Sequence, residues 1–132
     1  DNSDNIHRFL QKHQLILPSN ITVFPRQEDV ARFYNTASLV LNLSDKNLFI
    51  ETFGLTALEA MSAALPVIVP TVGGIAEFVD DGVNGYKIDV QNIDKIVDTI
   101  KYLFYDKEKY LLLAGNALKI SEKINNINQQ EF

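Results

Sequence analysis

Short apolar runs alternate with segments of helical periodicity along most of this chain. The runs are bounded by polar or turn-forming residues, which is typical of strands in a sheet covered on both faces. They occupy residues 21–24, 38–43, 66–69 and 86–88. Because strands and helices follow one another in turn, the pattern predicts a parallel sheet with helices on both faces.

Helical periodicity predicts helices in the segments before, between and after these strands. A first helix, capped by Ser3 or Asp4, is expected to end before Pro18, and a second helix to follow a cap at Asp29 or, less favourably, Glu28. The remaining helices are expected at residues 53 or 54 to 63, 75–79, 93–105 and 107 to about 124, with residues 125–130 frayed.

The expected fold class is therefore α/β, a Rossmann-like parallel sheet in one domain that spans residues 1–132. Leu55, Leu58 and Met61 are expected to face its core from one helix. In such sheets, ligands bind beyond the carboxyl ends of the strands. The loops at residues 51–55 and 71–74 are expected at two of these ends.

Composition excludes several kinds of protein. The 132 residues contain no cysteine, which excludes disulfides and thiolate metal sites, and the net charge of −5 gives no general attraction to nucleic acid or anionic lipid. No apolar run approaches the roughly 20 residues of a membrane span, and the polar first residues do not resemble a signal peptide. We expect a cytoplasmic protein without a nucleic-acid partner.

Two glycine turns are candidates for binding phosphate. Gly54 lies where a helix begins, so unpaired backbone N–H groups and the positive end of the helix dipole would face a ligand that no side chain obstructs. Gly73 and Gly74 offer a second turn of this kind. Each glycine turn taken alone would favour a purely structural role, because glycine is common wherever a strand becomes a helix.

Two carboxylates flank the first of these turns. Glu59 is about five residues into the helix, roughly 7 Å from its start, which suits a carboxylate that accepts hydrogen bonds from a ribose diol. The alternative for Glu59 is a capping box with Thr56. Glu51 precedes the helix and could hold sugar hydroxyls, or it could be an ordinary loop acid. A hydrolase with two catalytic carboxylates is a further alternative.

The ordered set of motifs resembles one family. It comprises Glu51-x7-Glu59, Phe53-Gly54-Leu55, Leu58-Glu59-Ala60-Met61, Pro66-Val67-Ile68, Gly73-Gly74, Glu77, Asp81-Gly82 and Gly85. In this order and spacing the motifs resemble the donor-binding domain of retaining glycosyltransferases of family 4, which have the GT-B fold. The resemblance extends from about residue 21 to residue 105.

The resemblance implies a role for each matched position. Glu51, the catalytic candidate, would contact hydroxyls of the transferred sugar, and Glu59 would hold the ribose. Backbone N–H groups of Phe53, Gly54 and Leu55 would bind phosphate and sugar oxygens. Two further pairs complete the implied site: Gly73 and Gly74 beneath the sugar and phosphates, and Pro25 and Arg26 near the base.

The implied donor is a UDP- or GDP-sugar, transferred to a glycan, lipid or other acceptor, with polysaccharide biosynthesis as the expected process. Family members generally need no metal held by a DxD motif, and this sequence contains none, so neither a metal nor a cofactor is expected. The alternatives are a sugar-nucleotide epimerase or a phosphorylase with the same fold, or a noncatalytic interaction module. The base, the sugar and the acceptor are not indicated.

Departures from the family pattern make the chain resemble a fragment. Ala64 stands where the family usually has a glycine, so a left-handed helix end there would cost about 1 kcal/mol. The family's first two strands of this domain, with a basic pair that neutralises the diphosphate, have no counterpart, which leaves Arg26 or Lys46 as substitutes. The amino-terminal acceptor domain that the resemblance implies has no counterpart in this sequence either, so we expect this chain alone to be inactive.

Two further expectations follow from that comparison. Without the first two strands, the sheet would have either a rearranged strand pairing or two exposed edges, and exposed edges would favour a homodimer. The full-length enzyme would work in the cytoplasm, either free or at the cytoplasmic face of a membrane.

Overall fold

The computed structural model describes residues 2–48, 50 and 54–130. The chain divides into two compact units, Asp1–Arg32 and Phe33–Phe132, and each is described by itself. In the described part of the chain, no helix combines the length and the apolar character that a membrane span requires.

The first unit contains helix α1, Asn2–Lys12. The expected caps are wrong, because Ser3 and Asp4 lie inside the helix. Gln14 adopts a left-handed φ of 54° at the helix end, and the Leu15 N–H donates to the Leu10 carbonyl at 2.9 Å. This bonding pattern terminates the helix before Pro18, as expected.

The strand expected at residues 21–24 is wrong, because the structure has no strand there. The strands of the described residues form one sheet of three, ordered β1-β2-β3, and none of them pairs with this segment. Ile21 is 50% exposed and Val23 is 43% exposed. An apolar, β-branched run forms a strand only where a neighbouring strand accepts and donates its backbone hydrogen bonds.

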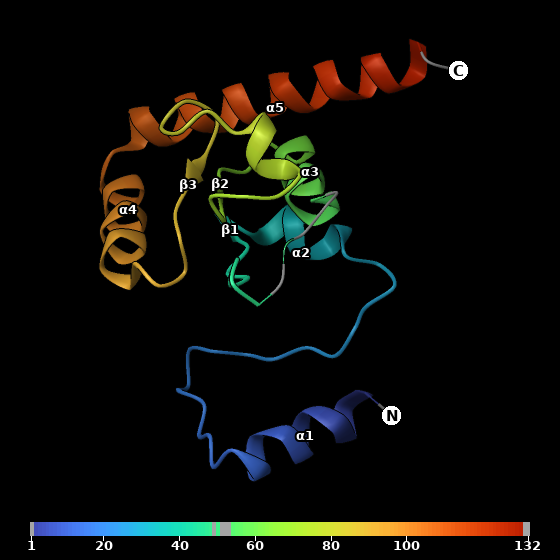
Figure 1. The fold of residues 1–132 in the computed structure, drawn as a ribbon, viewed down its shortest axis with the longest axis vertical. Coiled ribbons are helices and arrows are strands. Elements are labelled where there is room, and N and C mark those ends of the chain that lie inside the picture. Colours follow the sequence, from blue (N-terminus) through green and yellow to red (C-terminus); the bar gives the residue numbers. More distant parts are fainter. Residues whose placement is uncertain (1, 49, 51–53, 131–132) are drawn as a thin grey trace. The chain divides into compact units, whose positions relative to one another are not determined.

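The second unit is built on the parallel sheet (Figure 1). Strands β1, Val40–Leu41, β2, Val67–Val69, and β3, Tyr86–Lys87, are paired in this order. The register sets Val40 opposite Val67 and Ile68 opposite Tyr86. The strands expected at residues 66–69 and 86–88 are confirmed. The run at residues 38–43 yields only a two-residue strand with Leu41 exposed, because β1 lies at an edge of the sheet.

Alternation along β2 sends its side chains into two separate clusters. Val67 and Val69 pack with helix α3, Leu55–Ser62, the short helix η1, Ile75–Phe78, and helix α5, Lys107–Gln130. Ile68 faces the other side and packs with helix α4, Ile93–Tyr105. Helices therefore cover both faces of the sheet, which confirms the predicted α/β class.

The helices largely follow the sequence pattern, with two differences. Helix α2, Ala31–Thr36, begins after Asp29, whose carboxylate accepts the Ala31 N–H at 3.1 Å, as expected of a cap. Leu55 was expected in the core but is 62% exposed, because Ala57, Ala60 and Met61 form the buried face of α3. α5 continues to Gln130 instead of fraying from residue 125, since neither proline nor glycine interrupts its last turns.

Candidate functional site

The three strands are parallel, so the loops that follow them gather at the carboxyl ends of the strands, along one edge of the sheet. These loops begin after Leu41, Val69 and Lys87. They lead into α3, η1 and α4 respectively. The edge therefore brings together the two glycine turns that the sequence singles out.

Gly54 forms the start of α3 in a way that only glycine allows. Its φ is 62°, in the left-handed region, and a Cβ built on it would lie 2.3 Å from the Cβ of Ile75. The first helical hydrogen bond runs from the Leu58 N–H to the Gly54 carbonyl. The amides of Leu55 and Thr56 therefore have no helical acceptor, and no described side chain caps them.

The second glycine turn starts η1 and is packed against the first. Gly73 has a φ of 120°, and its carbonyl accepts the Ala76 N–H at 3.2 Å. Gly74 has a helical φ of −58°. Ile75 follows directly and is the residue that approaches Gly54. Gly73 and Gly74 thus border the amino end of α3, as the sequence predicts for a shared site.

Glu59 is the fifth residue of α3, and its side chain is exposed. Its Oε2 accepts a hydrogen bond from the Tyr34 hydroxyl at 3.1 Å. Burial, together with the hydrogen bond and the negative charge of Glu59, raises the pKa of Tyr34 to about 12. The capping-box alternative is wrong, because Gly54 occupies the cap position and no described side chain makes a cap bond there. The Glu59 carboxylate is left open to solvent and to a ligand.

The remaining predicted site residues are not tested by the structure. Glu51 and Phe53 lie outside the described residues. Pro25 and Arg26 belong to the first unit, where the Pro25 carbonyl accepts a hydrogen bond from Gln27 Nε2 at 3.0 Å. The roles assigned to these four residues, like those of the other predicted site residues, stay predictions.

The structure adds a polar cluster at the same sheet edge. Lys46 Nζ lies 3.2 Å from Asp89 Oδ2 and 3.4 Å from Thr71 Oγ1, so one ammonium group connects the loops after all three strands. A second link joins Gln91 Nε2 to Asp45 Oδ2 at 2.7 Å. Sequence reasoning named only Lys46. Asp89 comes shortly after the end of the last strand, and this position at the carboxyl end of a strand is the sequence signal that could have identified it as a site residue.

Hydrogen bonding also affects the titration of Asp89. The Gln91 backbone N–H, and secondly the Lys46 side chain, lower the pKa of Asp89 below its usual value of 3.8. The carboxylate is therefore ionised throughout the physiological range, and its contact with Lys46 is an ion pair.

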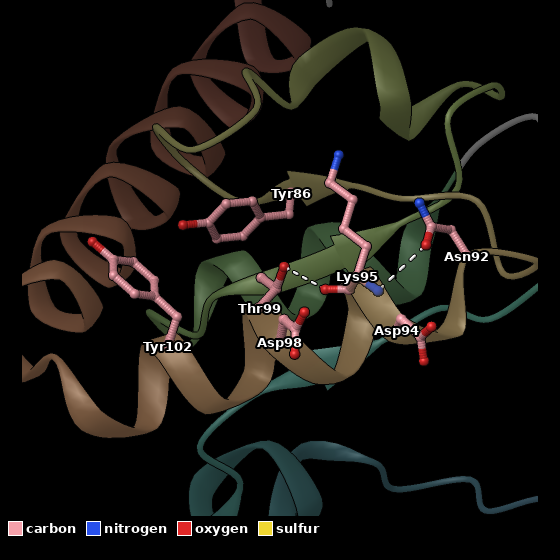
Figure 2. Close-up of a pocket in the computed structure, with 7 residues that line it drawn as sticks. All are labelled: Tyr86, Asn92, Asp94, Lys95, Asp98, Thr99 and Tyr102. Carbon is pink, nitrogen blue, oxygen red and sulfur yellow. Dashed lines mark hydrogen bonds between the residues drawn. The ribbon is translucent and has the colours of Figure 1, made fainter.

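A hollow of about 450 Å³ lies elsewhere in this unit, between α4 and β3 (Figure 2). It is lined by Tyr86, Asn92, Asp94, Lys95, Asp98, Thr99 and Tyr102. The two hydrogen bonds drawn there belong to α4 itself: Asn92 caps the helix through the Lys95 N–H, and the Thr99 hydroxyl donates to the Lys95 carbonyl. None of the predicted site residues lines this hollow.

Known proteins resemble this chain over about four fifths of its length. N-acetyl-alpha-D-glucosaminyl L-malate synthase of Bacillus anthracis is 34% identical over 103 residues, which cover 78% of this chain and 26% of that protein. D-inositol 3-phosphate glycosyltransferase of Mycolicibacterium smegmatis is 34% identical over 106 residues, 79% of this chain and 23% of that protein.

A solved structure of another protein also resembles this chain. The Anabaena protein HepE, crystallised in complex with UDP-glucose, superposes with a TM-score of 0.76 at 25% identity, over 97% of this chain and 35% of that one. The chain thus spans only about a quarter to a third of the length of these proteins. Residues 4–120 match the family model described as "Glycosyl transferases group 1", and the chain therefore belongs to that family.

Proposed function

We propose that this chain binds the nucleotide-sugar donor of a retaining glycosyltransferase of family 4. The observation that carries the proposal is the amino end of α3, where amides beside Gly54 that no described side chain caps share one helix with the exposed carboxylate of Glu59. At 1.5 Å per residue, the two are separated by roughly 7 Å along the helix. That spacing suits a diphosphate and the ribose attached to it.

Each predicted site residue has a place in this proposal. The amides from Phe53 to Leu55, aided by the positive end of the α3 dipole, bind phosphate and sugar oxygens. Glu59 accepts hydrogen bonds from the ribose hydroxyls. Glu51 contacts the transferred sugar as the catalytic candidate. Gly73 and Gly74 form the floor of the site. Pro25 and Arg26, which the sequence predicts near the base, belong to the first unit.

The proposed donor is a UDP- or GDP-sugar, and the UDP-glucose complex of HepE supports a uridine donor. We propose that binding requires neither a metal nor a cofactor. The negative charge of the diphosphate would be met by the α3 dipole and by Lys46, which lies among the loops of the same edge. With so few cations, affinity for the donor should be weak.

Transfer of the sugar would need more of the enzyme. This chain spans only about a quarter to a third of the length of the relatives, so we propose that an acceptor-binding domain of the same enzyme completes the site. Proximity of the two substrates supplies much of the rate in such reactions, and this chain alone should not catalyse transfer. The process would be polysaccharide biosynthesis in the cytoplasm, at the membrane face.

Self-association is a further part of the proposal. β1 is an edge strand, with Leu41 38% exposed, and Leu43 just beyond it is 49% exposed. An unpaired apolar edge can bind the same edge of a second copy. Light scattering after size exclusion should detect a dimer at high concentration, and a monomer throughout would contradict this part.

Calorimetric titration with UDP, GDP and ADP tests the proposed site. We expect one nucleotide to bind and Glu59→Ala to weaken that binding at least tenfold, with circular dichroism unchanged. Glu122→Ala is the matched control, because Glu122 is also an exposed helical glutamate, on α5. Undiminished binding by Glu59→Ala, or equal losses in both variants, would overturn the proposal.

A further inference from the structure

We propose that Tyr34 is a positioning residue that holds the Glu59 carboxylate in the orientation required for the ribose. This inference rests on the proposed function and deepens it. Tyr34 comes from α2 and Glu59 from α3, and the two residues are 25 positions apart in the sequence. Neither composition nor motif spacing singles out the tyrosine.

The contact fixes a side chain that would otherwise be mobile. Glu59 is exposed, and an exposed glutamate on a helix samples many rotamers. The Tyr34 hydroxyl donates to its Oε2 at 3.1 Å and lies 3.4 Å from the Thr56 carbonyl of the same helix. A hydroxyl held at the surface of α3 in this way can select one orientation of the carboxylate.

Tyr34 is itself held in place by the core. Its ring packs against the cluster that contains Ala57, Met61 and Val67, while its hydroxyl reaches the surface. A ring anchored by packing loses little further freedom when its hydroxyl bonds to a ligand-binding group. Tyr34 thus joins the hydrophobic core to the proposed ribose contact.

The hydrogen-bonding chemistry leaves room for the ribose. An ionised carboxylate has about four acceptor positions, and Tyr34 occupies one of them, so two adjacent ribose hydroxyls can still donate. Because the pKa of Tyr34 is about 12, its hydroxyl stays protonated and remains a donor at neutral pH.

The test compares UDP with 2′,3′-dideoxy-UDP, which lacks the ribose diol, in calorimetric titrations of the 132-residue chain. Tyr34→Phe removes only the hydroxyl. We expect it to weaken UDP binding about 3- to 10-fold, the effect of one hydrogen bond, and to leave dideoxy-UDP binding unchanged. The preference for the diol should therefore fall. A tyrosine that served packing alone would weaken both ligands equally.

Tyr110→Phe is the matched control. Tyr110 is half-buried like Tyr34, its hydroxyl donates to the Ser38 carbonyl at 2.6 Å, and burial raises its pKa too. Its loss should leave the diol preference intact. If Glu59→Ala abolishes the preference while Tyr34→Phe retains it, the inference is overturned and the proposed function stands. If none of UDP, GDP and ADP binds, or Glu59→Ala has no effect, both are overturned.

A second measurement examines the contact without a nucleotide. Carbon NMR of labelled tyrosine should give Tyr34 a pKa of about 12 in the native protein. In Glu59→Ala we expect a lower pKa that stays above 10, because burial is the largest cause of the shift and remains. An unchanged pKa in that variant would show that the hydroxyl does not bond to Glu59, and would overturn the inference.

Discussion

The carboxyl end of α3 depends on the backbone conformation of one residue, Ala64. Ala64 has a φ of 58°, and the next amide, Leu65 N–H, donates to the Ala60 carbonyl at 3.1 Å. This is the left-handed helix end that usually contains glycine, and alanine adopts it at a cost of about 1–2 kcal/mol. The left-handed helix end considered from the sequence is therefore present at Ala64, and its energetic cost stays a prediction.

Replacing this alanine should stabilise the protein. Ala64→Gly removes the strain but increases the freedom of the unfolded chain, so the net gain in the free energy of unfolding should be about 0.5–1 kcal/mol. Urea denaturation measures it. Ala63→Gly is the control, because Ala63 has an ordinary φ of −90°. A gain of equal size at both positions would contradict the strain argument.

Gly54 should tolerate no side chain. Alanine there would combine a left-handed φ with a Cβ 2.3 Å from that of Ile75, and the sum of strain and overpacking is about 2–5 kcal/mol. Gly115 provides the control, because a Cβ on that exposed helical glycine meets nothing within 4 Å. Gly115→Ala should stabilise by about 0.5–1 kcal/mol. Thermal melts showing both variants close to the wild type would refute this account.

Residue patterns predicted these backbone positions better than they predicted side-chain burial. Gly54 begins α3, and the left-handed position at residue 64 lies where the sequence indicated, because local chain geometry decides both. Leu55 was expected in the core and is 62% exposed. As the first residue of the helix it lies off the face that Ala57 and Met61 bury, and periodicity alone did not fix that phase.

Among the elements, the loops after the strands are joined by side chains distant in sequence. Lys46 bonds to Asp89 and Thr71, and Gln91 bonds to Asp45. Each of these contacts joins two different loops, so no single loop contains all the residues of the polar cluster. These contacts set the loops around the amino ends of α3 and η1, where the proposed donor phosphates would lie.

The pKa of Asp89 tests this cluster. Lys46→Met should raise it from its depressed value only part of the way to 3.8, because the Gln91 backbone hydrogen bond, the largest cause, persists. Carbon NMR of the carboxyl group measures the change. Lys95→Met is a control on an exposed lysine of α4. A return to 3.8 would show that Lys46 dominates, and no change would show that the ion pair does not form.

The same shift has a consequence for stability. Since the folded state lowers the pKa of Asp89, ionised Asp89 stabilises the native protein above the unfolded value of 3.8. That contribution is lost as the pH falls through the lower, folded value. Acid denaturation of Lys46→Met should therefore show a weaker dependence on pH in the region below 3.8.

At this scale, the predicted strands formed only where the sheet supplied neighbours. The run at residues 66–69 is buried between two strands and became β2, whereas the comparable run at residues 21–24 formed no strand. Apolar composition indicates a tendency, and pairing depends on the rest of the sheet. The cross-loop contacts of Lys46 depend on that assembled sheet as well, so no sequence spacing indicated Asp89 as its partner.

At the scale of the whole molecule, the order of the motifs along the sequence was the strongest guide to the fold and to the candidate site. The parallel sheet brings Gly54, Gly73 and Gly74 to one edge, as the α/β pattern predicted. Glu59 lies on the helix that begins there. The contact of Glu59 with Tyr34 was missed, because it joins two helices whose packing no local pattern describes.

The central claim is that this edge binds a nucleoside diphosphate. The most direct test is an NMR titration of the chain with UDP, GDP and ADP, following the amides of Gly54, Leu55, Gly73 and Gly74. We predict chemical-shift changes confined to these two turns and their neighbours, with one nucleotide preferred. A folded sample whose amides at these four positions do not respond to any of the three nucleotides at millimolar concentration would contradict the account.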